Sequence, residues 1–228
     1  WRSSPSMGCD EWYAAHATGS LSVVVQASYT NVVRGFTIDF VARIDGTPTC
    51  SRWAFGDGMI VPNQPYSSHA WQSTGRFDVV LTAFNNDFPN GVSCTQQVTI
   101  FERPILYVDA DNTTPDPPYD TWETAAVRIQ DAVDAAAIPG SVVLVADGVY
   151  DEGSVVVEGD VPNRVAVTNP ISVRSVNGPQ STRIRGQGPI GVSGIRCAWV
   201  VDGAVLSGFT LTGGHGSYQG SIRGAGGA

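Results

Sequence analysis

Short stretches of β-branched and aromatic residues, interrupted at close intervals by turn residues, run through most of the chain. Among its 228 residues are 26 Gly and 14 Pro. Gly and Pro both disfavour the interior of helices, whereas Val, Ile and aromatic residues favour strands. The sequence therefore predicts an all-β protein.

Residues 1–20 lack periodicity, and we expect them to form an N-terminal arm. Residues 21–104 are predicted to form one domain, because their short segments alternate between apolar and polar positions. Such alternation buries one face of each strand, as in two sheets packed face to face. The expected strands are 21–29, 36–44, 50–55, 77–84 and 93–101.

A compact aromatic and glycine motif, W-A-F-G-D-G at residues 53–58, lies inside this domain. Gly56 and Gly58 suit a tight turn, while the two aromatic residues suit the core. We expect Asp57 to hydrogen-bond the backbone of that turn; calcium binding or catalysis is the alternative. His69 is expected to be a hydrogen-bonded core or turn residue, since no triad-like pattern surrounds it.

These motifs resemble the PKD domain family. The family pattern W-x-F-G-D-G is followed by H-x-[YW] and then by G-x-[YF]-x-V-x-L-x-A-x-N. Trp71 stands where Tyr is commoner in the family, which keeps an aromatic residue. The resemblance covers residues 21–104 and implies an Ig-like β-sandwich in which the motif is structural. The motif residues are Trp53, Phe55, Gly56, Asp57, Gly58, His69 and Trp71.

The chain has four cysteines, and none shows the spacing of a zinc or redox site. Cys50 and Cys94 are expected at the same end of a sheet, on either side of strand 77–84, which predicts a disulfide between them. Cys9 and Cys197 then remain to bridge the domains, to pair with another chain or to stay free. Disulfides imply an oxidising compartment.

Residues 105–228 show a different pattern. Apolar residues at helical spacing predict one helix, about 122–137, with Thr121 as its N-cap. The short segments after it are separated by single turns and fit stacked coils, because each coil buries its inward face against a neighbour. The helix would cap the first coil. Expected strands are 105–109, 141–145, 154–157, 164–167, 171–176, 182–185, 195–201, 204–206 and 208–212.

Residues 129–136, 139–150 and 203–212 are similar to the start of proteins of the pectin-lyase-like superfamily. This resemblance implies a right-handed parallel β-helix with one N-terminal capping helix, as in large exported bacterial proteins. It points to an architecture and not to an activity.

The formal net charge is −8, and all 13 basic residues are scattered arginines, which argues against a nucleic-acid partner. No apolar run is long enough to span a membrane. The all-β composition and the expected disulfides together predict a secreted or cell-surface protein.

Asp109, Asp111 and Asp116 offer alternating carboxylates to a calcium ion. They lack the Gly and terminal Glu of a calcium loop, so a solvated turn is favoured. No other cofactor is expected. Enzymes of the similar superfamily use clustered carboxylates on successive coils, and no such cluster recurs here, so no catalytic residues are expected.

Two functions follow from these patterns. The first is a non-catalytic structural or adhesive module, which joins copies of itself into an oligomer or filament, or continues into further coils, through open β-helix ends. The alternative is a lyase- or hydrolase-like protein that acts on polysaccharides, or one that binds surface glycans.

Overall fold

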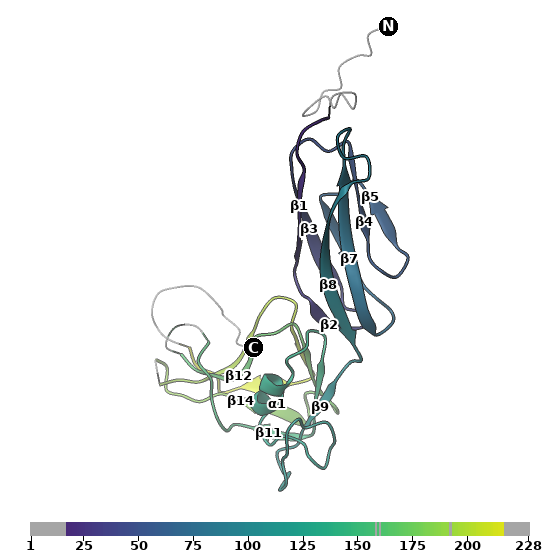
Figure 1. Ribbon diagram of the computed structural model, residues 1–228. Coiled ribbons are helices and arrows are strands. Elements are labelled where there is room, and N and C mark those ends of the chain that lie inside the picture. Colours follow the sequence, from purple (N-terminus) through teal and green to yellow (C-terminus); the bar gives the residue numbers. More distant parts are fainter. Residues whose placement is uncertain (1–16, 158, 160, 192, 217–228) are drawn as a thin grey trace. The chain divides into compact units, whose positions relative to one another are not determined.

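The computed structural model describes residues 17–157, 159, 161–191 and 193–216. The chain divides into two units, residues 1–101 and 102–228. Both are built mainly from strands, and the fold is all-β (Figure 1). In the described part of the chain, no helix has the length and apolar character needed to cross a membrane.

The first unit is a sandwich of two sheets. One sheet has the order β1-β3-β6 and the other the order β2-β8-β7-β4-β5. The predicted strands are present, and three short strands, β2, β5 and β6, were not anticipated. The strands are β1 (Ser22–Ala27), β2 (Asn31–Val33), β3 (Ile38–Asp45), β4 (Cys50–Ala54), β5 (Ile60–Pro62), β6 (Tyr66–His69), β7 (Gly75–Phe84) and β8 (Val92–Phe101).

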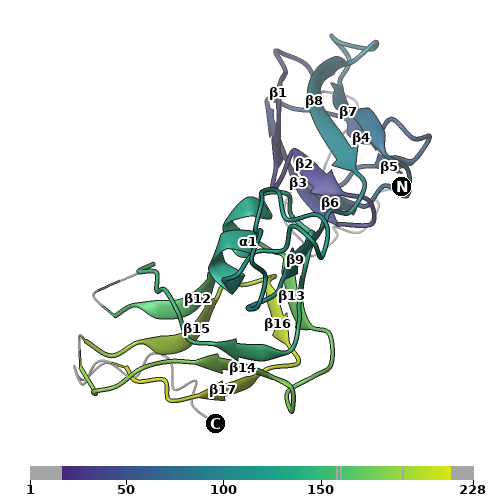
Figure 2. The same cartoon turned by 90° about the horizontal axis from the view of Figure 1, so that it is seen from below.

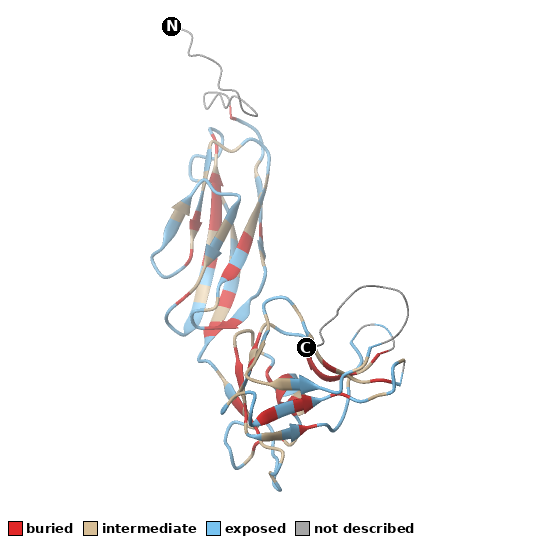
Figure 3. Ribbon diagram, turned by 180° about the vertical axis from the view of Figure 1, so that it is seen from behind, coloured by how far each residue is buried: buried red, intermediate tan, exposed pale blue. Residues whose placement is uncertain are grey.

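Alternation along the strands places the core between the two sheets, as the bands of buried residues in Figure 3 show. On β7, the odd-numbered residues Val79, Leu81 and Ala83 are completely buried. Val79 and Leu81 pack in one cluster with Phe40 and with Trp53, Phe55 and Trp71 of the motif. The core is thus formed by the residues whose period-two pattern predicted it.

The second unit is a parallel β-solenoid with three sheets, ordered β16-β13-β10-β9, β11-β14-β17 and β12-β15. Every pair of neighbouring strands in it is parallel. The strands are β9 (Ile105–Val108), β10 (Val142–Val145), β11 (Gly148–Tyr150), β12 (Asn163–Val167), β13 (Ser172–Ser175), β14 (Thr182–Arg185), β15 (Arg196–Val200), β16 (Val205–Ser207) and β17 (Thr210–Thr212).

Side chains stack in register through the coils. Leu106, Val143, Val173 and Leu206 occupy successive rungs of one sheet. The first three are buried in the core of this unit, and Leu206 packs partly buried against it. Figure 2 shows the coils lying one above another, with β12 beside β15 and β14 beside β17. The segment expected as a strand at 154–157 contributes only an isolated bridge, from Val155 to Asn163.

The capping helix α1 (Ile129–Ala135) is shorter than the predicted helix at 122–137. Its N-cap is the extended residue Arg128, not Thr121. The cause is a β-bridge between Ala126 and Val108, closed by hydrogen bonds from Ala126 N to Tyr107 O and from Asp109 N to Ala126 O. This pairing keeps Ala126 out of the helix, because a residue bonded to a strand cannot also be helical. Residues 121–124 before it form bends and a turn, with a hydrogen bond from Ala125 N to Trp122 O.

The helix covers the edge of the first coil, as expected. Its side chain Gln130 bonds the edge strand β12: Ala166 N donates to Oε1 at 2.7 Å, and Nε2 donates to Ala166 O at 3.3 Å. On the neighbouring sheet, β9 is covered by the bridge at Ala126 and by a hydrogen bond from Tyr107 N to Tyr119 O. The first coil therefore does not offer free strand edges along β9 and β12.

Candidate functional site

The glycine turn of the 53–58 motif is organised around Asp57. Its Oδ1 accepts a hydrogen bond from Met59 N at 3.1 Å, two residues further on, which is the hydrogen bond of an Asx turn. Gly56 and Gly58 have φ values of 79° and 97°, in the region that favours glycine. The turn is thus specified by all three residues.

The second oxygen of Asp57 lies 2.7 Å from Nε2 of His69 on β6. Burial raises the pKa of Asp57, but the hydrogen bonds from His69 and Met59 N outweigh burial, and the pKa falls below its usual value of 3.8. The imidazole stacks on Phe55 at 4.4 Å between centroids and meets the Trp71 ring edge-on at 4.6 Å. His69 therefore links the turn to the aromatic core.

The two motif tryptophans are core residues with satisfied donors. Trp71 Nε1 donates to Phe55 O at 3.0 Å, and Trp53 Nε1 donates to Gln64 O at 2.9 Å. Both rings are at most 1% exposed. An open depression borders His69, Trp71 and Phe77, but its aromatic rings serve the packing of the sandwich. The geometry thus favours a structural role for the motif.

The predicted disulfide between Cys50 and Cys94 is absent. Cys50 pairs with Phe84 and Cys94 with Leu81, across opposite sides of β7. The two cysteines therefore lie two strand spacings apart, about 10 Å, whereas a disulfide needs Cα atoms within about 7 Å. Leu81 and Phe84 are three residues apart, so the two thiols also point to opposite faces of the sheet.

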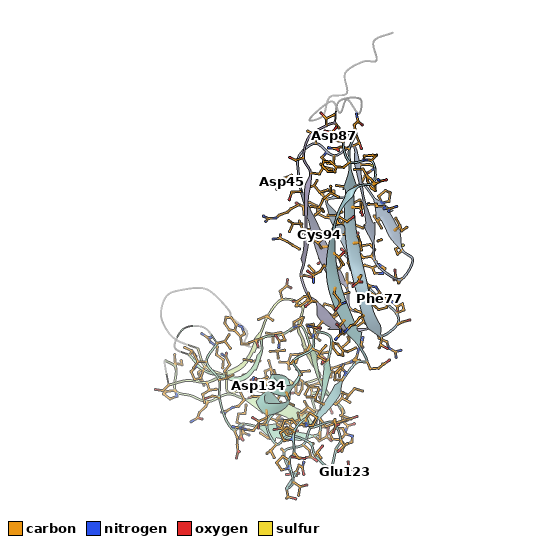
Figure 4. All side chains as sticks on the ribbon, in the orientation of Figure 1. Asp45, Phe77, Asp87, Cys94, Glu123 and Asp134 are labelled. Carbon is orange, nitrogen blue, oxygen red and sulfur yellow. The ribbon has the colours of Figure 1, made fainter. Side chains whose placement is uncertain are left out.

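The described cysteines Cys50, Cys94 and Cys197 are all free thiols. Figure 4 labels Cys94 on β8. Cys197 is buried, and its Sγ lies 3.3 Å from Thr212 O. Cys9 lies outside the described residues. The free thiols therefore give no support for the oxidising compartment that the expected disulfides implied.

The structure does not bring the three aspartates proposed for calcium together as a group of ligands. Asp109 Oδ1 accepts a hydrogen bond from Asp111 N at 3.0 Å, which closes a local turn. Asp116 N donates instead to Thr124 O at 3.1 Å. Among the residues that the structure describes, no three His, Cys, Asp or Glu side chains are grouped so as to hold a metal ion.

A small cavity of about 250 Å³ lies in the solenoid beside α1. Asp111, Asp151 and Glu152 line it together with the buried Arg164. The Arg164 guanidinium donates to the carbonyls of Arg185 and Gly153. Burial lowers its pKa, although the charge of Asp151 acts in the opposite direction. The cavity gathers three carboxylates that sequence spacing had not brought together.

A second depression, of about 380 Å³, follows one sheet of the solenoid. Trp122 borders it with 41% of its surface exposed, although sequence analysis placed this residue inside a helix. The signal that could have revealed an exposed Trp is the preceding segment 112–121, whose prolines and threonines favour a loop. The other lining residues are Asp109, Ala146, Asp147, Val176 and Asn177.

Comparison with known proteins identifies the first unit. Residues 22–98 match the PKD domain family, so this unit is a PKD β-sandwich. No curated protein matches the chain in sequence. The resemblance of the second unit to the pectin-lyase-like superfamily, and a bacterial origin, stay predictions.

Three solved structures are similar to the chain, at 18% to 20% identity. The first concerns carbohydrate-binding modules of the β-sandwich superfamily (TM-score 0.34, 20% identity, 43% of this chain and 37% of that one). The PKD1 domain of Vibrio anguillarum Epp has a TM-score of 0.29 and 18% identity, over 36% of this chain and 98% of that one. The PKD domain of the human VPS10 domain-containing receptor SorCS2 has a TM-score of 0.30 and 20% identity, over 44% and 97%. At these TM-scores the similarities do not bear on function.

Proposed function

We propose that this protein is a non-catalytic extracellular module with a structural or adhesive role, and that it associates with a second copy of itself through the coil formed by β15, β16 and β17. The match of residues 22–98 to the PKD family supports the extracellular setting. The shape of the solenoid, a regular stack of parallel strands, supports a structural role.

One observation carries the self-association: within the described residues, β15, β16 and β17 are each paired on one side only. Unpaired backbone donors and acceptors on such an edge are a template for another strand. Apolar side chains lie exposed along the same coil, with Val200 at 42%, Val205 at 48% and Leu211 at 37% exposed. Burying them against another layer would stabilise the association.

The strand edges that are occupied in the first coil limit how two copies can pair. Gln130 occupies the edge of β12, and the bridge at Ala126 occupies the edge of β9. Another copy therefore cannot pair with the edges of β9 and β12, whereas β11 is paired on one side only within the described residues. Pairing of the coil of β15, β16 and β17 with the same coil of another copy can use all three of its edges, so we propose this arrangement, which is a closed two-fold dimer.

Light scattering coupled to size-exclusion chromatography, over a micromolar to millimolar series, tests this proposal. We expect a dimer at high concentration that the variant Val205→Lys abolishes, because a charged edge strand resists pairing. Val24→Lys is the matched control, since Val24 is similarly exposed, at 45%, on the sandwich. A wild-type protein that stays monomeric throughout the series would refute the dimer.

A polysaccharide-active function is the second candidate, supported by the cavity that Asp111, Asp151 and Glu152 line. Glycoside hydrolysis needs two carboxylates that face one substrate. Incubation with neutral and acidic polysaccharides, with and without calcium, tests this function. Cleavage that disappears in Asp151→Asn or Glu152→Gln would replace the non-catalytic proposal.

A further inference from the structure

The turn after the four-stranded sheet of the solenoid brings polar side chains from separate coils into one row. Val108, Val145 and Ser175 occupy neighbouring rungs of β9, β10 and β13. Asp109 directly follows the first of these strands, while Asp147 and Asn177 follow the other two by one more residue. Asn177 Nδ2 donates to Asp147 Oδ1 at 3.0 Å, which fixes two members of the row.

Trp122 lies at this row as an exposed aromatic ring. Its ring packs on Tyr107 of β9 with centroids 4.5 Å apart and planes at 54°. Among the tryptophans that the structure describes, only Trp122 is exposed, at 41%, whereas Trp53 and Trp71 are buried. A single exposed aromatic residue is common on protein surfaces, so the indole points to a ligand only together with the row of polar side chains beside it.

The loop that carries Trp122 is anchored on both sides of the ring. Thr124 N donates to Thr121 Oγ1 at 3.2 Å, and the two hydroxyl oxygens lie 3.0 Å apart. Asn112 Nδ2 donates to Glu123 O at 3.2 Å and to Ala125 O at 2.6 Å. These bonds fix the loop backbone on both sides of Trp122, and the contact with Tyr107 orients its ring, which reduces the entropy cost of binding a ligand.

The charges around the depression restrict its ligand. Its lining contains two carboxylates, Asp109 and Asp147, and no Arg or His. Each carboxylate uses Oδ1 in a hydrogen bond within the protein, and Oδ2 of each has no hydrogen-bond partner in the described part of the chain. Anionic ligands such as uronates or phosphates would be repelled, while groups that donate hydrogen bonds would be attracted.

We propose that Trp122, Asp109, Asp147 and Asn177 form a binding site for an uncharged sugar residue of a polysaccharide. The indole presents a flat apolar face to the C–H face of a sugar ring. The free carboxylate oxygens accept hydrogen bonds from sugar hydroxyls, and Asn177 Oδ1 offers a further acceptor. Rungs of the sheet are spaced by about 4.8 Å, a separation that hydroxyls of one sugar ring can bridge.

This site does not depend on the proposed self-association, because none of its residues belongs to β15, β16 or β17. A result that refutes one of the two proposals therefore leaves the other unaffected. A variant such as Val205→Lys that lacks the dimer should still bind the sugar.

Isothermal titration of the whole chain with neutral oligosaccharides (cellohexaose, xylohexaose, mannohexaose and maltohexaose) tests the site, with polygalacturonate as the acidic comparison. We expect one of the neutral sugars to bind and polygalacturonate not to bind. Trp122→Ala should weaken binding by about tenfold or more, the loss of one aromatic contact. Trp122→Phe should restore part of the affinity, and Asp147→Asn should weaken it.

Tyr66→Ala is the matched control, because Tyr66 is an exposed aromatic residue of the other unit, 70% exposed on the sandwich. Far-UV circular dichroism establishes that each variant is folded, and Trp122→Phe keeps an aromatic ring against Tyr107. Absence of binding to every neutral sugar at millimolar concentration would overturn the proposal. So would equal binding by Trp122→Ala, or a preference for a lysine-rich peptide, which two carboxylates beside an indole would also attract.

Discussion

Nε2 of His69 lies 2.7 Å from Oδ2 of Asp57 and joins a glycine turn to the aromatic core of the sandwich. The contact spans two elements that are separated in sequence, the turn after β4 and the strand β6. It explains why the family pattern contains both an Asp between glycines and a His before an aromatic residue: each supports the other.

Replacement of Asp57 by Asn should lower the free energy of unfolding at neutral pH by about 1 kcal/mol, a modest value because the contact is partly exposed. The folded pKa of Asp57 lies below its usual value of 3.8, so its contribution is complete above that pH and disappears as the pH falls further. Urea unfolding followed by tryptophan fluorescence, at neutral and acid pH, measures both effects.

Asp45→Asn is the control for this prediction, because it removes the same charge from the end of β3 (labelled in Figure 4). Its unfolding free energy should stay near that of the wild type at neutral pH. A difference between wild type and Asp57→Asn that is equally large at acid pH would show that the ionised contact is not the cause.

Gly56→Ala and Gly58→Ala should differ in their effects. Both positions have positive φ, which costs roughly 1–2 kcal/mol for a residue with a Cβ atom. At Gly56 a Cβ would also lie 3.1 Å from Asp78 O, whereas at Gly58 it would meet nothing within 4 Å. We therefore expect the larger loss of unfolding free energy for Gly56→Ala. Equal losses would mean that only backbone conformation matters at this turn.

Thiol reactivity should separate the described cysteines. Cys50 is exposed, Cys94 partly buried and Cys197 buried. Alkylation of the native protein, followed by peptide mass mapping without reductant, should label Cys50 first and Cys197 only after denaturation. Recovery of a peptide pair linked through Cys50 and Cys94 would contradict the strand register of β4, β7 and β8.

Gln130→Ala should destabilise the solenoid by about 1–3 kcal/mol, because it leaves the buried N–H of Ala166 without a partner. Gln130→Glu keeps the acceptor for that N–H and should cost less. Hydrogen exchange of peptides that cover β12 measures the local effect. Unchanged exchange in Gln130→Ala would show that the helix covers this edge by packing alone.

Much of the strand pattern could be predicted from the sequence, because period-two alternation and glycine turns are local features. Residues Val79, Leu81 and Ala83 are buried as their alternation predicts. The short strands β2, β5, β6 and β11 escaped prediction, since three or four residues carry too little alternation to distinguish a strand from a loop.

The sequence by itself determined that this is an all-β chain with a PKD motif, followed by coils that start beside one helix. Tertiary structure alone decided which distant residues meet. Cys50 and Cys94 pair with residues of β7 that are an odd number of positions apart, so their side chains lie on opposite faces of the sheet. A single bridge at Ala126 shortened the helix and left Trp122 in an exposed loop beside Asp147 and Asn177. Pairing between strands depends on partners far away in the chain, and no local pattern of residues encodes that choice.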